Sequence, residues 1–152
     1  MRWGWSTEEN HWNNLEKFVE ENQKYIEWKH ITATYRLVDN IPENPGVYSF
    51  NVYRGHKSFE GNNNIYPNLY DSIDDIMNSL YSPIYIGISD NLRSRFRSHM
   101  LRNPKIKEAV DTFSHSKRTS LVYSWTEFPK ILTRDYERYL IAVFGPTLNN
   151  QG

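Results

Sequence analysis

The fold of this chain is decided by residues 83–99, which read PIYIGISDNLRSRFRSH. The first part is apolar and rich in β-forming residues, so it predicts a strand over residues 84–88 that ends in a glycine turn. Asp90 or Asn91 can cap the helix that follows, which we predict over residues 91–101. Three polar side chains therefore meet around one strand-to-helix junction: Tyr85, Arg95 and His99.

The flanking sequence predicts two more strands and several helices. A turn over residues 39–46 leads into an alternating, β-rich run at residues 47–53, and a third such run covers residues 120–128. Apolar spacing and boundary signals mark four further helical segments: residues 6–28, 70–80, 104–113 and 133–144. We therefore predict an α+β fold in which a small three-stranded, mostly antiparallel sheet is flanked by helices.

The length of 152 residues predicts a single domain with one core, spanning residues 1–152. Residues 1–40 are expected to form an N-terminal helical extension that packs onto this core. The core is expected to cover residues 45–149 and to contain an insertion, residues 55–80, between its first two strands.

The composition excludes several kinds of site. The chain has no cysteine, which rules out disulfides, thiolate catalysis and cysteine-ligated zinc. No apolar run approaches the ~20 residues of a membrane-spanning helix. The first five residues lead straight into polar sequence and lack the apolar centre of a signal peptide. We therefore expect a soluble, cytoplasmic protein without membrane partners.

Positive charge is concentrated in one segment, although the formal net charge is 0. Between residues 90 and 107 the only acidic residue is Asp90, against six basic residues. Such a segment is either an ordinary solvated surface or a nucleic-acid-binding surface. Apart from Arg95, the candidate nucleic-acid-binding residues are Arg93, Arg97, Arg102, Lys105 and Lys107.

The sequence neighbours of Arg95, His99 and Glu137 make these residues candidates for a catalytic or metal-binding site. Arg95 and His99 are four residues apart, and Leu92 and Phe96 border the helix face that they share, so this face is expected to point partly inward. An inward arginine needs an anionic partner, which is either a core carboxylate or a phosphate. Glu137 lies among apolar residues of the last predicted helix, where it forms either a buried ion pair or a ligand for one divalent cation.

Together, these features resemble the GIY-YIG nuclease superfamily. Gly46-Val47-Tyr48 is similar to the first strand motif of that family, and Tyr85-Ile86-Gly87 matches the second motif. The other family positions are an arginine, a histidine, a metal-binding glutamate and a closing asparagine, which correspond here to Arg95, His99, Glu137 and Asn149. The resemblance covers residues 45–149. The long segment between the two strand motifs is similar to insertions in restriction endonucleases of the family.

The resemblance implies a GIY-YIG-like fold and a type II restriction-like endonuclease that hydrolyses DNA phosphodiesters to 5′-phosphate and 3′-hydroxyl ends. It implies Mg²⁺ as the cofactor, held by Glu137 and replaceable by Mn²⁺. DNA is the implied partner, and a homodimer is expected if the recognised site is palindromic. Asn149 is expected to orient Glu137 or its water shell. The implied catalytic residues are Tyr48, Tyr85, Arg95, His99, Glu137 and Asn149.

The family roles make physical sense for the remaining residues. Tyr48 is expected to take a proton from the attacking water, with positive charge from Arg95, the bound metal and His99 lowering its pKa. Tyr85 is expected to order the water or the phosphate, and Arg95 to stabilise charge on the phosphate oxygens.

Three alternatives remain open at this stage. One is a catalytically silent nucleic-acid-binding module of the same fold. Another is a nuclease of the family that serves a mobile element or DNA repair. The third is a partner-binding α+β domain whose motif matches are accidental. Digestion of a plasmid with and without Mg²⁺ distinguishes the nucleases from the other two.

Overall fold

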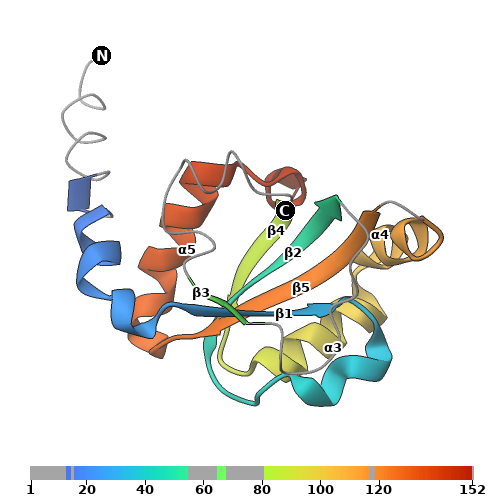
Figure 1. Ribbon diagram of the computed structural model, residues 1–152, viewed down its shortest axis with the longest axis horizontal. Coiled ribbons are helices and arrows are strands. Elements are labelled where there is room, and N and C mark those ends of the chain that lie inside the picture. The colour runs from blue at the N-terminus through green and yellow to red at the C-terminus, as the bar shows by residue number, and fades with distance from the viewer. Residues whose placement is uncertain (1–12, 15, 55–64, 68–80, 117–118, 152) are drawn as a thin grey trace.

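The computed structural model describes residues 13–14, 16–54, 65–67, 81–116 and 119–151 (Figure 1). The strands in this part of the chain are β1 (Glu27–Thr32), β2 (Gly46–Arg54), β3 (Ile65–Pro67), β4 (Tyr81–Ser89) and β5 (Thr119–Glu127). The longer helices are α3 (Leu92–Arg102), α4 (Pro104–Ser114) and α5 (Lys130–Phe144). Residues 16–21 are also helical, and short 3-10 helices are η1 (Gln23–Tyr25), η2 (Tyr35–Asn40) and η3 (Thr147–Gln151).

The strands form one antiparallel sheet in the order β3-β1-β5-β2-β4. The predicted α+β class and the antiparallel sheet are therefore confirmed. The prediction of three strands is wrong, because β1 pairs with β5 and β3 pairs with β1. In this sheet β2 is paired on both sides, whereas β4 lies at an edge.

Strand β1 replaces the end of a predicted helix. The sequence predicted a helix through residue 28, but the helical segment ends at residue 21 and the chain is extended from Glu27. Trp28 and Ile31 are fully buried in the clusters on opposite faces of the sheet. The predicted helix therefore extended into a strand that is covered on both faces, a case in which apolar spacing does not separate the two structures.

Helices cover both faces of the sheet (Figure 1). Helices α3 and α4 pack on the face that contains Tyr48, Phe50 and Tyr123. Helix α5 and the helical segment near Val19 pack on the opposite face, against Val47 and its neighbours. Because successive side chains of a strand alternate between faces, adjacent Val47 and Tyr48 belong to different layers. This alternation places Tyr48 beneath α3.

The helix boundaries follow the local signals in the sequence. Asn91 is the N-cap of α3, and its Oδ1 accepts a hydrogen bond from the N–H three residues later at 3.0 Å. Pro104 opens α4, where its missing N–H is not needed. Helix α5 ends at Phe144, and the next residue, Gly145, has a φ of 55°, which is left-handed and favours glycine. It begins at Lys130, three residues before the predicted start.

The predicted insertion lies mostly outside the described residues. Of residues 55–80, the structure describes only 65–67, which form β3, and the helix predicted over residues 70–80 falls outside them.

Among the residues that are described, no helix combines the length and apolar character that a membrane crossing requires.

Candidate active site

Three ring side chains from different elements meet beneath α3. Tyr48 on β2 and Tyr85 on β4 have ring centroids 6.1 Å apart, and His99 on α3 lies 5.4 Å from Tyr48 and 5.0 Å from Tyr85. The Tyr48 hydroxyl and His99 Nε2 are 2.6 Å apart. Tyr48 and His99 are buried, whereas Tyr85 is half-buried. The structure thus brings these three predicted site residues together, and Tyr85 is the one that solvent reaches.

The proton on His99 is placed by Asn103, which the sequence analysis did not assign to the site. Asn103 Oδ1 accepts hydrogen bonds from the N–H groups of Lys105 and Ile106, as the N-cap of α4. Its Nδ2 therefore faces His99 Nδ1, at 3.0 Å, and donates to it. An imidazole that accepts at Nδ1 has its proton on Nε2, so His99 donates to the Tyr48 hydroxyl. The sequence signal that could have identified Asn103 is its position directly before Pro104, because an asparagine before a helix-opening proline is typical of an N-cap residue.

Burial keeps both Tyr48 and His99 neutral. Desolvation, together with the charge of Arg95, lowers the pKa of His99 to about 4. Desolvation raises the pKa of Tyr48 well above its usual value, Tyr85 and Tyr123 add to this rise, and Arg95 opposes it. His99 therefore does not supply the positive charge that the sequence analysis expected. Arg95 is the cation that acts on Tyr48.

The low pKa of His99 predicts a loss of stability in mild acid. His99 has a pKa of about 4 in the fold and about 6.5 when unfolded, so between these values the unfolded chain binds more protons. The stabilisation is complete above pH 6.5 and is lost as the pH falls toward 4, by up to about 3 kcal/mol. Urea unfolding of the wild type and His99→Gln should show their stability difference shrinking by about 2 kcal/mol from pH 7 to pH 5. Parallel pH profiles of the two proteins would contradict a neutral His99.

The two motif glycines are required by close packing. A Cβ at Gly87 would overlap the hydroxyl and ring of Tyr48, its partner across β2 and β4. A Cβ at Gly46 would overlap the backbone carbonyl of Thr126 and the side chain of Leu92. The glycine in the second strand motif therefore makes room for a tyrosine of the first.

Gly87→Ala is expected to destabilise the fold by about 1–3 kcal/mol, because the added methyl group must displace the buried Tyr48 ring. Urea unfolding measures the change. The same substitution should have a much smaller effect in a Tyr48→Ala background, where the ring is gone. An equal loss in both backgrounds would show that the overlap with Tyr48 is not the cause.

Arg93 and Arg95 are two residues apart on α3 but have different surroundings. Arg93 Nε donates to the Ile41 carbonyl at 2.7 Å, and its Nη groups donate to the Asp39 carbonyl and the Glu43 carboxylate. Arg93 therefore attaches η2 and the following loop to α3, and its role in nucleic-acid binding stays a prediction. Arg95 is exposed and, among the described residues, forms no ion pair with a carboxylate.

Asn149 attaches η3 to the edge of β4. Its Oδ1 accepts from the Ile86 N–H at 2.8 Å, and its Nδ2 donates to the Ile86 carbonyl at 2.7 Å. These bonds satisfy the outer edge of β4 and attach η3 to it, between Tyr85 and Gly87. Asn149 thus positions the strand that holds Tyr85, and its orientation of Glu137 or the water shell stays a prediction.

Glu137 lies on α5, which covers the face of the sheet opposite α3. It is half-buried, and desolvation raises its pKa, whereas Arg134 and Arg138 of its own helix lower it. In the part of the chain that the structure describes, neither a hydrogen bond nor an ion pair joins Glu137 to Tyr48 or His99. Helix α5 packs mainly on β4, the edge strand that also contains Tyr85. Glu137 therefore lies on the helix that packs against β4, and it is not part of the Tyr48–His99 cluster.

No cluster of three or more His, Asp and Glu side chains suited to a metal ion is found among the described residues. Mg²⁺ does not require such a cluster, because it commonly binds one or two carboxylates and completes its shell with water and phosphate oxygens.

Comparisons of the chain with protein-family models, with curated proteins and with solved structures gave no match. The functional assignment therefore depends on the geometry of the chain itself.

Proposed function

We propose that this chain is a divalent-metal-dependent endonuclease that hydrolyses DNA phosphodiester bonds. The observation that supports it best is the 2.6 Å hydrogen bond between Tyr48 and His99, with Tyr85 packed beside it. Arg95, on the same helix as His99, acts electrostatically on both Tyr48 and His99. Phosphodiester hydrolysis needs a cation that holds the phosphate and polar groups that orient the attacking water.

The hydrogen bonds of the cluster form a directed chain that ends at the accessible tyrosine. Asn103 donates to His99, and His99 donates to Tyr48. Tyr48 is in turn hydrogen-bonded to Tyr85, an interaction that raises the pKa of Tyr48. The Tyr85 O–H is thereby left to donate outward, toward water or a phosphate oxygen.

This direction of donation changes the role proposed for Tyr48. Burial raises its pKa, so Tyr48 remains a phenol at neutral pH and cannot act as a resting base. We assign it a positioning role, in which it relays the orientation of His99 to Tyr85. The exposed guanidinium of Arg95 is assigned to the scissile phosphate, which it can bind with two hydrogen bonds.

Glu137 and water would hold the divalent cation, Mg²⁺ or Mn²⁺. When bound, the cation would neutralise charge on the leaving oxygen. Because the ligand must be the ionised carboxylate and desolvation raises the pKa of Glu137, metal binding should strengthen as the pH rises through that pKa.

The DNA would be attracted by basic side chains of α3 and α4. Three of them, Arg102, Lys105 and Lys107, are exposed, and Arg97 is half-buried. Arg93 is not included, because its guanidinium is bound to η2 and its neighbouring loop. A type II restriction-like enzyme, acting as a homodimer on a palindromic site, is the form of the proposal that the inserted segment favours.

Digestion of a supercoiled plasmid tests the proposal. With Mg²⁺ or Mn²⁺ the protein should produce nicked or linear DNA whose ends carry 5′-phosphate and 3′-hydroxyl groups, and EDTA should prevent it. Arg95→Ala protein, purified in the same way, controls for contaminating nucleases. Intact plasmid and genomic DNA after incubation with either cation would overturn the proposal.

A catalytically silent nucleic-acid-binding domain is the second candidate. It is favoured by the raised pKa of Tyr48 and by the separation of Glu137 from the cluster by the sheet. Such a domain would bind DNA in a salt-dependent manner but leave the plasmid intact.

A further inference from the structure

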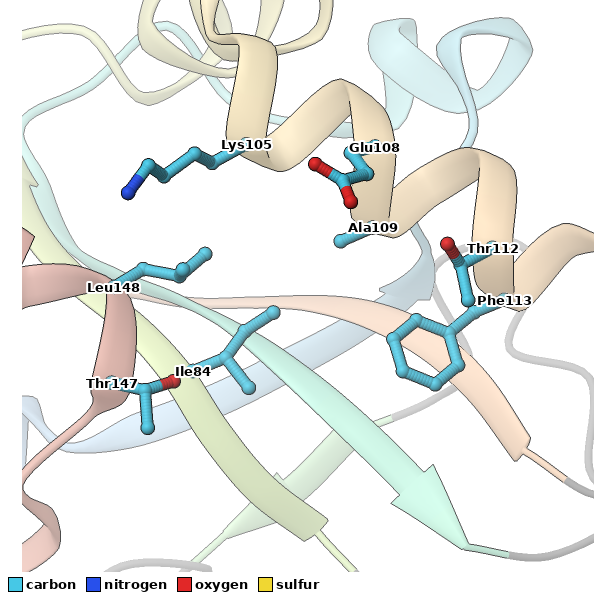
Figure 2. A pocket seen from close by; sticks show the side chains of 8 residues that line it. All are labelled: Ile84, Lys105, Glu108, Ala109, Thr112, Phe113, Thr147 and Leu148. Carbon is cyan, nitrogen blue, oxygen red and sulfur yellow. The ribbon is translucent and has the colours of Figure 1, made fainter.

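A pocket of about 320 Å³ lies between α4, β4 and η3, on the α3 side of the sheet (Figure 2). Its volume falls within the range of about 300–1,000 Å³ that is usual for small-ligand sites. The lining residues from α4 are Lys105, Glu108, Ala109, Thr112 and Phe113, and those from the other elements are Ile84, Thr147 and Leu148. No role described above uses this pocket.

Two residues that line the pocket directly precede residues of the candidate active site in the sequence. Ile84 on β4 directly precedes Tyr85, and Leu148 on η3 directly precedes Asn149, which is bonded to Ile86. Ile84 is the extra residue of a bulge, because Phe50 pairs with Tyr85 whereas the next residue of β2 pairs with Pro83. A bulge redirects side chains locally, and Ile84 points into the pocket in Figure 2.

The chemistry of the pocket is divided between an apolar interior and a charged rim. Ile84, Phe113 and Leu148 supply apolar surface, including one aromatic ring. Lys105 and Glu108, three residues apart on α4, point toward the pocket from one side (Figure 2). Both are exposed, and neither forms an ion pair among the described residues. A flat, apolar ligand with hydrogen-bonding groups on one edge matches this division.

We propose that the pocket binds an unpaired guanine base, adjacent to a phosphate at Tyr85 and Arg95. This proposal rests on the proposed nuclease function. The guanine ring packs between the apolar side chains, as an extruded base does in enzymes that act on nucleic acids. The Glu108 carboxylate accepts from guanine N1–H and N2–H₂, and the Lys105 ammonium donates to guanine O6.

The rim distinguishes guanine from the other bases. Guanine presents two adjacent donors to one carboxylate, with an acceptor beside them for a lysine. Thymine presents a single N–H between two carbonyl oxygens, which would place an oxygen against Glu108. Adenine and cytosine each offer one exocyclic amine to the carboxylate and no second donor beside it on that edge. The base is unpaired because this edge is occupied in a duplex.

Calorimetric titration with nucleoside monophosphates tests the proposal without requiring cleavage. In EDTA, the full chain should bind dGMP more tightly than dTMP by about tenfold, the size of one bidentate base contact. Glu108→Gln should abolish this preference, and Ala109→Phe should abolish binding by filling the pocket. Asp111→Asn, an exposed acid on the same helix outside the pocket lining, should change neither.

Oligonucleotides distinguish a strand from a free nucleotide. A short single strand with one guanine should bind, and Ala109→Phe should weaken its binding, whereas the matching duplex should be insensitive to this substitution. Equal affinity for dGMP and dTMP, or dGMP binding that survives Ala109→Phe with an unchanged melting temperature, would overturn the proposal.

The two proposals can fail separately. Binding of dGMP without DNA cleavage would overturn the nuclease and leave the pocket assignment standing. Cleavage without a guanine preference would overturn the pocket assignment alone.

Discussion

Replacing Glu137 with alanine is expected to abolish magnesium-dependent DNA cleavage while leaving the fold intact. Glu137 is the half-buried carboxylate that we assign to the divalent cation, so its removal takes away the one ionic ligand that the protein supplies. The fold should tolerate the change, because desolvation raises the pKa of this group and its ionised form is not favoured by the surroundings. Plasmid digestion at a fixed Mg²⁺ concentration, together with thermal unfolding, measures both effects.

A matched acid on the same helix provides the control. Asp135 is also half-buried on α5, and Asp135→Asn should retain cleavage. DNA binding, measured by fluorescence anisotropy in EDTA, should be the same for wild type and Glu137→Ala. If Glu137→Ala cuts at the wild-type rate in Mg²⁺, the cation is not held by this residue and the one-metal mechanism is wrong.

Replacing Arg95 with alanine is expected to reduce the cleavage rate by about 100-fold or more, the loss seen when a single charge-stabilising donor is removed from an active site. Arg95 is exposed, has no carboxylate partner among the described residues, and acts on both Tyr48 and His99. Single-turnover cleavage with saturating protein measures the chemical step. Arg95→Lys should recover only part of the rate, because lysine keeps the charge but not the paired hydrogen bonds.

Arg93→Ala separates catalytic from structural arginines on the same helix. Arg93 donates to the Ile41 and Asp39 carbonyls and to Glu43, so its loss should lower the free energy of unfolding by about 1–2 kcal/mol. The cleavage rate of the folded protein should remain near that of the wild type. A rate loss for Arg93→Ala that equals the loss for Arg95→Ala would show that neither arginine has a specific catalytic role.

Much of the fold could be predicted from local sequence signals. The strand at residues 84–88, the Asn91 cap and the Gly145 stop all depend on short-range chemistry, namely β propensity, a side-chain cap and a left-handed backbone. Strand β1 was missed because a strand buried on both faces has no alternating pattern that separates it from a helix. Its partner β5, next to it in the sheet, lies roughly ninety residues away along the chain, and local spacing does not contain that information.

The candidate site could be predicted only in part from the sequence. Tyr48, Tyr85 and His99, three of the six predicted catalytic residues, lie together in the structure, but the role of each arginine on α3 was not determined by its position in a basic run. Arg93 faces η2 and its loop, whereas Arg95 is exposed, because residues two apart on a helix point in directions about 160° different.

The chain by itself determined which side chains are present and where helix caps and the glycine helix stop lie, because propensities, caps and glycine conformations act over a few residues. Tertiary structure alone decided the chemical state of those side chains. Burial beneath α3 lowers the pKa of His99, a cap on the next helix selects its tautomer, and a neighbouring strand needs Gly87 to leave room for Tyr48. Desolvation and packing depend on atoms brought together from distant positions, so they exist only in the folded chain.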